Sequence, residues 1–411
     1  MPISEGNGIF VEILITIGQQ MTQKKSIKAF LLQPESIFFF GLLLTLIFST
    51  TELVSLKANN FQIFAYGSKD FWGGTNPYSA WEHTGVAGNN LDRYLYGPLF
   101  SILFTPFAFL PWWLGAAVWN LTSYSAFFYS LYSCKIWDNK RLAVVFFLLV
   151  GIMVSSIMSF QFNLLITAMF LFIYKFLEEE RYTLALLLLV IGALTKVYIA
   201  FAGVLLFFYP QFWKNIGRGI LLSAVGLLLP AIRVGVDGLL PYYRSWFDAV
   251  SIREAPERFE VVYRLIGKIG FPEVYQYTLP ILLAATILPT LVVAYCVRKD
   301  KGIPRTTLAA MLIGTVMMTL MVWGNSTERH TYIIGMTGYL LWGYAKGYMS
   351  RTDKIFTALF FFFYVICPID VLCPVKIRRI ILDHNNLGVI FALILWGRMS
   401  LEPLLLCRNR S

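Results

Sequence analysis

The sequence predicts an all-α polytopic membrane protein with about twelve transmembrane helices. Of its 411 residues, 57% are hydrophobic and only 14% are charged, whereas soluble domains are usually about a quarter charged. Several apolar segments approach the roughly 20 residues that a helix needs to cross a bilayer. Lys and Arg recur in the turns between these segments, as expected of cytoplasmic loops. Barrel-like alternation is absent, and an open sheet cannot satisfy its backbone in lipid.

The first half of the chain begins with a predicted cytoplasmic segment, 1–35, because lysines precede the first apolar span. A polar and aromatic first outer loop is expected at 57–98, where glycines and prolines break regular structure. The stretch 99–110 is interpreted as a re-entrant or interfacial helix. The predicted spans of this half are 36–56, 112–134, 142–160 and 164–176.

The stretch 183–209 is too long for one span and carries Lys196 near its middle, which is costly in hydrocarbon. Two short helices with Lys196 at the outer turn avoid that cost, and every later basic loop but one then falls inside. The exception is the basic cluster at 376–379, which falls outside.

The remaining spans follow by alternation and place both ends of the chain in the cytoplasm. A second large outer loop is expected at 236–277, with mixed charges typical of a solvated lid. One multi-helix domain therefore covers 36–397, and 398–411 form a cytoplasmic tail. The spans of this half are 219–235, 277–297, 306–323, 331–345, 355–372 and 387–396.

The net charge of +11 is assigned to cytoplasmic loops rather than to nucleic-acid binding, because no Lys/Arg block is interleaved with aromatic residues. The five cysteines are scattered and show no metal-ligand spacing, so neither a metal nor another cofactor is expected. Phosphate-binding P-loops, His-Glu-x-x-His and Gly-x-Ser-x-Gly motifs are also absent from the sequence.

The first outer loop holds three carboxylates, Asp70, Glu82 and Asp92. A carboxylate within hydrogen-bond reach can accept a proton from a sugar hydroxyl. The rings of Tyr94 and Tyr96 are suited to stacking on sugars. The simpler alternative is a solvated loop with aromatic anchors at the membrane interface.

Three further places concentrate polar groups on the same predicted side. Lys196, followed by Tyr198, can bind a lipid phosphate as a point charge, or it can extend toward the interface. The turn that contains Glu328, Arg329 and His330 offers a phosphate clamp and a group that titrates near neutral pH, or it is an ordinary polar turn. Gln161 and Asn163, at another outer turn, satisfy helix ends or contact substrate.

An ordered series of short motifs resembles glycosyltransferase family 87, the polyprenyl-phosphate-sugar-dependent, mannosyltransferase-like membrane proteins, and particularly their bacterial branch. The resemblance covers residues 36–397. Its motifs are Asn60-Phe-x-Ile-Phe, Gly73-Gly-x-Asn-Pro-Tyr, Tyr94-x-Tyr-x-Pro, Pro106-Phe-Ala-x-Leu-Pro, Trp119-Asn, Gln161-x-Asn163, Lys196-x-Tyr198 and Ser326-Thr-Glu328.

The resemblance implies a C-type glycosyltransferase fold in a bacterial cytoplasmic (inner) membrane, with an active site that faces outward. It also implies inverting transfer of a hexose, mannose in the family, from a polyprenyl-phosphate donor to a hydroxyl of a glycan or glycolipid acceptor. The family's phosphate-binding lysine corresponds to Lys196 and its late-loop histidine to His330. The family's basic aspartate corresponds to Asn60, which cannot accept a proton.

The departure at Asn60 leaves several possibilities open. Another carboxylate substitutes, with Asp92 preferred over Glu82 and Asp70, or the protein is a non-catalytic homologue that binds the donor. A different class of function, a transporter or flippase for lipid-linked saccharides, would need polar groups through the membrane midplane, for which Arg233 is a candidate.

Overall fold

The computed structural model describes residues 32–79, 82–251, 262–299, 302–325, 327–368, 372–384 and 386–408. The predicted N-terminal segment, 1–35, lies almost wholly outside the described residues. So do 252–261 in the second predicted loop, Ser326, and the last three residues of the predicted tail.

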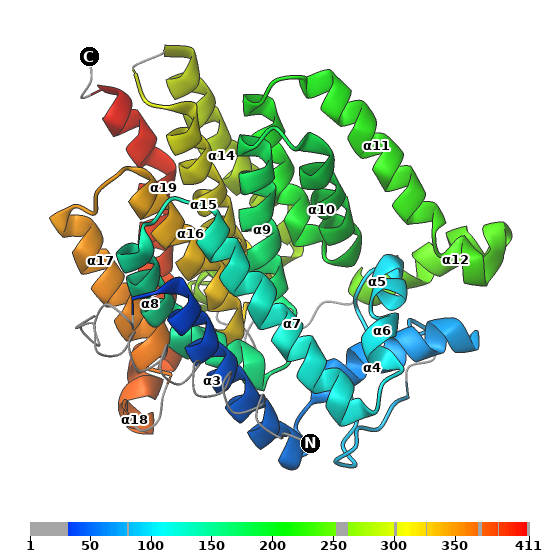
Figure 1. Ribbon diagram of the computed structural model, residues 1–411. Helices are drawn as coiled ribbons and strands as arrows, with labels where there is room; N and C mark the ends of the chain where they lie inside the picture. Colours follow the sequence, from blue (N-terminus) through cyan, green and yellow to red (C-terminus); the bar gives the residue numbers. More distant parts are fainter. Residues whose placement is uncertain are drawn as a thin grey trace, which may run out of the picture.

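Helices account for nearly all regular structure in these ranges, and an isolated antiparallel bridge joins Thr84 to Asn90 (Figure 1). In chain order the helices are α3 (Pro34–Val54), α4 (Asn59–Gly73), α5 (Pro98–Leu103), α6 (Thr105–Ala108), α7 (Trp112–Ser133), α8 (Asn139–Met158), α9 (Asn163–Glu178), α10 (Tyr182–Thr195), the 3-10 helix η1 (Val197–Phe208), α11 (Phe212–Leu228), α12 (Ala231–Ser251), α13 (Val262–Lys268), η3 (Pro272–Tyr277), α14 (Thr278–Lys299), α15 (Arg305–Trp323), η4 (Arg329–Thr331), α16 (Tyr332–Ala345), α17 (Arg351–Phe361), the π-helix η5 (Phe362–Ile366), α18 (Val375–Arg378), the π-helix η6 (Arg379–His384) and α19 (Leu387–Arg408).

Five helices within the described residues are long and apolar enough to cross a membrane: α3, α8, α14 with the preceding η3, α15 and α19. The pair α11 and α12, bent by 99° at its junction, makes a sixth if it counts as one span. The expected number of about twelve crossings is therefore not confirmed. Several other expected spans form helices shorter than these, including α9 with 16 residues, α16 with 14 and α17 with 11.

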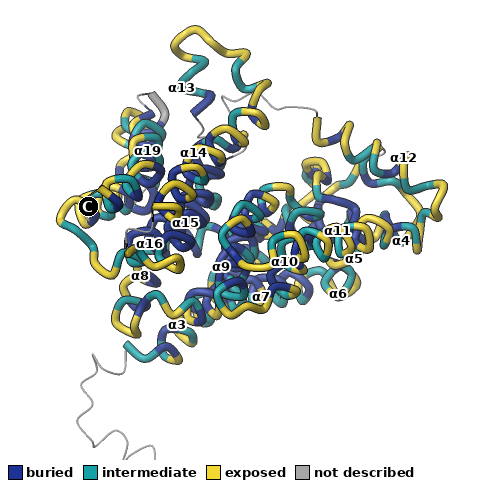
Figure 2. The backbone as a smooth tube through the Cα atoms, turned by 90° about the horizontal axis from the view of Figure 1, so that it is seen from above, coloured by how far each residue is buried: buried dark blue, intermediate teal, exposed yellow. Residues whose placement is uncertain are grey.

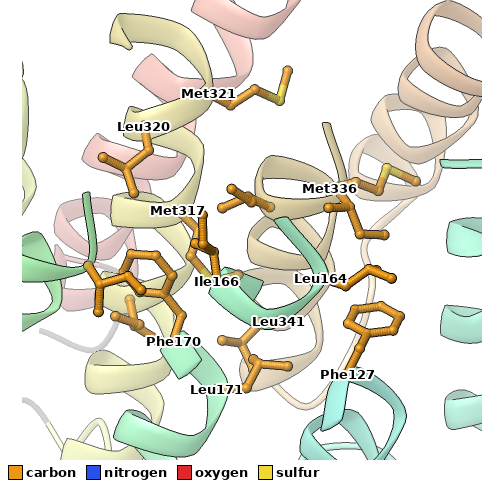
Figure 3. Close-up of a cluster of buried hydrophobic side chains, with 14 of the residues drawn as sticks. Phe127, Leu164, Ile166, Phe170, Leu171, Met317, Leu320, Met321, Met336 and Leu341 are labelled. Carbon is orange, nitrogen blue, oxygen red and sulfur yellow. The ribbon is translucent and has the colours of Figure 1, made fainter. Parts of the chain in front are cut away.

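The centre of the bundle is built around α15 and α16. A Cβ on Gly314 of α15 would overlap the carbonyl oxygen of Gly338 on α16, and the converse also holds, so both positions need glycine for the backbones to touch. Small residues of this kind allow close packing between membrane helices. Leu164, Phe170 and Met317 are fully buried in the cluster that joins α9 to this pair (Figure 3).

The outer helices carry exposed apolar side chains. Phe39 on α3, Leu221 on α11 and Leu291 on α14 are each more than half exposed, and exposed positions follow the rim of the bundle in Figure 2. In a chain with several span-length apolar helices, such faces are suited to lipid rather than water.

The two ends of the bundle differ in chemistry. At one, here called the basic end, Arg141 donates to the carbonyl of Gly347 (3.3 Å), and Arg305 stacks over Tyr209, whose hydroxyl bonds Glu178. Because Tyr209 follows η1 and Glu178 precedes α10, these two helices form a hairpin with Lys196 at the far turn. The expected division of 183–209 into two short helices is confirmed.

The other end, here called the Lys196 end, holds the turn between α8 and α9 and the segment 325–331. Tyr198 beside Lys196 bonds Asn325 (2.9 Å), and η4 packs against α8. The basic cluster at 376–379 also lies toward this end, because α18 lies at the lower end of the bundle in Figure 1, and Tyr364 of the preceding η5 contacts the ring of Tyr332 at the start of α16.

The first predicted loop, 57–98, contains a helix. α4 buries Phe61, Phe64 and Phe71 along one face and packs them against α5 and α6. In Figure 1, α4 and α12 run across the direction of α9, α14 and α15. The helical spacing of these phenylalanines provides a buried face that the loop prediction overlooked.

The later predicted boundaries also differ from the structure. α12 continues to Ser251, and α13 lies within the second predicted loop, 236–277. α19 extends through most of the predicted tail, 398–411, because Arg398 and Glu402 join a buried ion-pair network with Lys346 and Asp353. A tail with such partners is held in the helix rather than solvated.

Candidate active site

The candidate site is centred on Lys196, which lies at the turn between α10 and η1. Its ammonium group is 5.8 Å from the ring centroid of Tyr96 and 5.5 Å from that of Tyr198. Desolvation lowers the pKa of Lys196 to about 8, and the charge of Glu328 opposes this shift. At neutral pH the group is therefore a cation, held between two aromatic faces, that is ready to bind an anion.

Tyr96 is held against the α10 turn by its neighbour in sequence. The backbone amide of Gly97 donates to the carbonyl of Thr195 (3.0 Å), and a Cβ on Gly97 would overlap the carbonyl oxygen of Leu194. The ring of Tyr96 packs edge-on against Phe64 of α4 (4.7 Å between centroids). Burial, Glu328 and Tyr198 together raise the pKa of Tyr96, so its phenol stays protonated and can donate.

The segment before α16 brings an acid–base pair to the same place. Nε2 of His330 lies 2.7 Å from a carboxylate oxygen of Glu328. Glu328 also begins η4, where its backbone amide donates to the Thr331 hydroxyl (3.2 Å). Since the Glu328 charge acts on both Lys196 and Tyr96, this pair lies beside the cation. Arg329 lies in the same short turn and is partly buried.

Asn60 adjoins this site at the start of α4. Its side-chain amide donates to the carbonyl of Ser159 at the end of α8 (2.8 Å), a bond that a carboxylate could not make. Gln161 and Asn163 follow directly at the α8–α9 turn, with Gln161 partly exposed and Asn163 buried. The carbonyl oxygen of the Asn163 side chain has no hydrogen-bond partner among the described residues.

A second acid–base pair lies further along α4. Asp70 bonds Nε2 of His83 at 2.7 Å, and the ring of Tyr66 stacks on the imidazole with 4.4 Å between centroids. The histidine is 13 residues from the aspartate in the sequence, beyond the glycine and proline breakers of the first predicted loop. In the sequence His83 is isolated in a loop, and the fold shows that it pairs with Asp70.

The other predicted site residues divide into exposed and structural positions. Glu82 and Asp92 are exposed. Tyr94 is fully buried, and its hydroxyl is hydrogen bonded to that of Ser101 (2.9 Å), so it packs the space between α4 and α5 rather than lining an open site. The structure therefore brings together Lys196, Tyr96, Tyr198, Glu328 and His330.

Comparison with known proteins identifies a family for this chain. The model of glycosyltransferase family 87 matches residues 94–322, more than half of the chain. The chain belongs to glycosyltransferase family 87. The match includes Tyr96, Lys196 and Tyr198, but begins after Asn60 and ends before Glu328. No curated protein matches the sequence.

Family membership and the apolar helices together make the protein a membrane glycosyltransferase, with a sugar donor, an acceptor and membrane lipid as its partners. Among the residues that the structure describes, no three His, Cys, Asp or Glu side chains lie close enough to hold a metal ion.

Proposed function

We propose that this protein transfers a hexose, mannose by analogy with its family, from a polyprenyl-phosphate donor to a hydroxyl of a cell-envelope glycan or glycolipid. The observation that carries the proposal is the partly desolvated Lys196 cation between Tyr96 and Tyr198, with the Glu328–His330 pair beside it. A cation flanked by tyrosines can bind one phosphate, and the adjacent carboxylate can accept the proton of an incoming hydroxyl.

The phosphate is proposed to belong to a lipid because apolar side chains border Lys196. Leu95 is 43% exposed and Val197 is 47% exposed, and each adjoins a residue of the cation site in sequence. A polyprenyl chain can lie on these side chains while its phosphate reaches the ammonium group. We place this end of the bundle on the extracytoplasmic face of a bacterial cytoplasmic membrane because the loops rich in Lys and Arg gather at the basic end.

In the proposed reaction, the acceptor oxygen attacks the anomeric carbon and the bond from that carbon to the phosphate oxygen breaks. The acceptor proton passes to the base, and the configuration inverts. The donor phosphodiester carries one negative charge and the departing monoester carries two near neutral pH. Lys196, together with Arg329, would stabilise this added charge more strongly in the transition state than in the bound donor.

Glu328 is proposed as the base. Asn60, at the position of the family's aspartate, uses its amide to hold Ser159, while η4 packs Glu328 and its neighbours against the same helix, α8. Glu328 can thus supply the carboxylate that Asn60 lacks, and His330 orients it at 2.7 Å. Asp70 with His83 is the second candidate base, and Asp92 and Glu82 are exposed.

The test uses purified protein, a labelled polyprenyl-phosphate hexose and a panel of acceptor glycolipids. Glu328→Gln keeps the acceptor oxygen of the helix cap but removes the base, so transfer should fall by about 10²–10⁴-fold. Asp70→Asn and Asp92→Asn serve as matched carboxylate controls and should remain active. Loss of transfer in Asp70→Asn with an active Glu328→Gln would move the role of base to Asp70.

A second candidate function is donor binding without turnover, which the amide at Asn60 favours. It predicts that the protein retains the labelled donor while releasing no polyprenyl phosphate with any acceptor. Transport of lipid-linked saccharides has less support, because Arg233 lies at the corner between α11 and α12, where it bonds the end of α4 (Nε to the Trp72 oxygen, 2.9 Å).

A further inference from the structure

A separate pocket of about 310 Å³ lies between the end of α4 and the corner of α11 and α12. Its lining residues are Phe71, Gly74, Thr75, Asn76, Arg233, Val234 and Tyr242. Figure 1 shows α4 and α12 on the same side of the molecule, away from the central helices. The catalytic proposal above uses none of these residues.

Arg233 supplies the charge of this pocket. One of its N–H groups, on Nε, donates to the carbonyl of Trp72 in the last turn of α4 (2.9 Å). A guanidinium has five N–H donors, so four remain after this bond. Within the described part of the chain, no carboxylate lies within ion-pair distance of Arg233. The group is an exposed cation whose other N–H donors have no partner among the described residues.

Tyr242 provides a second, independent observation. Only 5% of this residue is exposed, yet its hydroxyl makes no hydrogen bond in the structure. Two polar groups act on this hydroxyl from nearby: the hydroxyl of Ser101, which is hydrogen bonded to that of Tyr94 at 2.9 Å, and the carboxylate of Asp70. A buried hydroxyl without a partner is costly, and an acceptor bound in the pocket would satisfy it.

The chemistry of the pocket points to an oxyanion. Arginine, a tyrosine hydroxyl, and the side chains of Thr75 and Asn76 together offer several donors around a single cation. The guanidinium fork matches the oxygens of phosphate better than a single halide or a neutral sugar.

The surroundings identify the source of this anion as a lipid. Ile232, Val236 and Leu240, on the same turn and helix as Arg233, are 69%, 76% and 70% exposed. Together with the 99° bend between α11 and α12, they place a cation where an apolar surface changes direction. We propose that Arg233 and Tyr242 bind the phosphate of a membrane lipid at this corner.

This site is distinct from the one at Lys196 but is joined to it by aromatic rings. Centroid separations of 5.3, 5.6 and 6.0 Å link Tyr242 to Tyr78, Tyr78 to Tyr94 and Tyr94 to Tyr96. The hydroxyl of Tyr78 also donates to the carbonyl of Tyr96 (2.7 Å). A chain of four tyrosine rings would therefore connect a lipid at Arg233 to the proposed transfer site.

The experiment measures binding of dioctanoyl phosphatidic acid to the full-length protein in neutral detergent by native mass spectrometry. All proteins carry Lys196→Gln, so that the site at Lys196 does not contribute to the measured binding. The result can then be interpreted even if the transferase proposal fails. Arg233→Gln retains a donor for the Trp72 carbonyl but loses the charge. It should weaken binding by about tenfold to a hundredfold.

The controls test separately whether binding depends on the charge at Arg233, on the position of that charge and on the phosphate of the lipid. Arg244→Gln, an exposed arginine of α12 outside the pocket, should bind as the parent does. Arg233→Lys and Tyr242→Phe should each weaken binding, by less than Arg233→Gln, which keeps the test valid if Arg233→Gln does not fold. Dioctanoylglycerol, without phosphate, should not bind.

Three results would overturn the proposal: parental affinity in Arg233→Gln, equal binding of dioctanoylglycerol, or binding of inorganic phosphate as tight as that of the lipid. The last would show a site for free phosphate rather than for a headgroup.

Discussion

Replacement of Lys196 by glutamine removes the charge on which the proposed reaction depends most. An ammonium about 4 Å from a phosphate oxygen interacts by about 1 kcal/mol in bulk water and about 4 kcal/mol at an effective dielectric of about 20. Lys196 lies between these limits, because it is partly exposed while its pKa is lowered by desolvation to about 8. A loss of about 3 kcal/mol in the transition state corresponds to about a hundredfold lower kcat.

The assay follows release of polyprenyl phosphate from a labelled donor in single-turnover and steady-state experiments. Because charge on the phosphate grows as the bond breaks, kcat should fall more than KM rises. Lys69→Gln is the matched control, since Lys69 is an exposed lysine over the ring of Tyr66 on α4. A kcat for Lys196→Gln within threefold of the parent would refute the role assigned to this lysine.

Four other predictions test the site and the fold. First, kcat/KM should fall above about pH 8, because Lys196 loses its proton as the pH rises through its lowered pKa; Lys196→Arg should remove this basic limb of the profile. Second, Glu328→Gln should release polyprenyl phosphate from the donor only at the rate that the phosphate-binding residues support without a base, and neither added imidazole nor a shift of pH should restore transfer. Third, Gly97→Ala would press a methyl group into the carbonyl of Leu194, so transfer should fall at least tenfold with a lower melting temperature; an alanine at Gly217, where nothing lies within 4 Å, should change neither. Fourth, Asp353→Asn should cost about 3 kcal/mol of unfolding free energy, because it leaves an uncompensated positive charge in a buried network; an unchanged unfolding midpoint would contradict this.

The ion-pair network of Asp353 also predicts how the stability of the fold changes with pH. Burial tends to raise the pKa of Asp353, but hydrogen bonds from Ser350 and the charge of Lys346 outweigh it and lower the pKa below the ordinary value. A carboxylate with a lowered pKa in the folded state contributes stability above its unfolded pKa. That stability is lost as the pH falls below about 4, the region of the unfolded value.

The position of Lys196 at a turn could be predicted from the sequence, because a lone lysine in an apolar hairpin has few places to lie. The cost of Lys196 in hydrocarbon favoured two short helices, and the structure has α10 and η1. Alternation of the spans then predicts that the 325–331 turn lies at the same end of the bundle as Lys196. Charge and hydropathy act along the whole chain, so this level of organisation can be predicted without tertiary contacts.

Details that depend on contacts between distant segments could not be predicted in this way. The pairing of Asp70 with His83 requires the chain to fold back over Tyr66. The position of Arg233 beside the end of α4 depends on the 99° bend between α11 and α12. α4 was expected to be a loop because its glycine and polar residues hide the spacing of its buried phenylalanines. The number of crossings is not confirmed, because apolar runs in a sequence do not show where each helix ends.

The most direct test of the central proposal is a cryo-electron microscopy structure with a non-hydrolysable polyprenyl-phosphonate hexose bound. The phosphonate is predicted within hydrogen-bond reach of Lys196 Nζ, with Glu328 the carboxylate closest to the anomeric carbon. A phosphonate bound at the basic end of the bundle, or an anomeric carbon that faces no carboxylate, would contradict it.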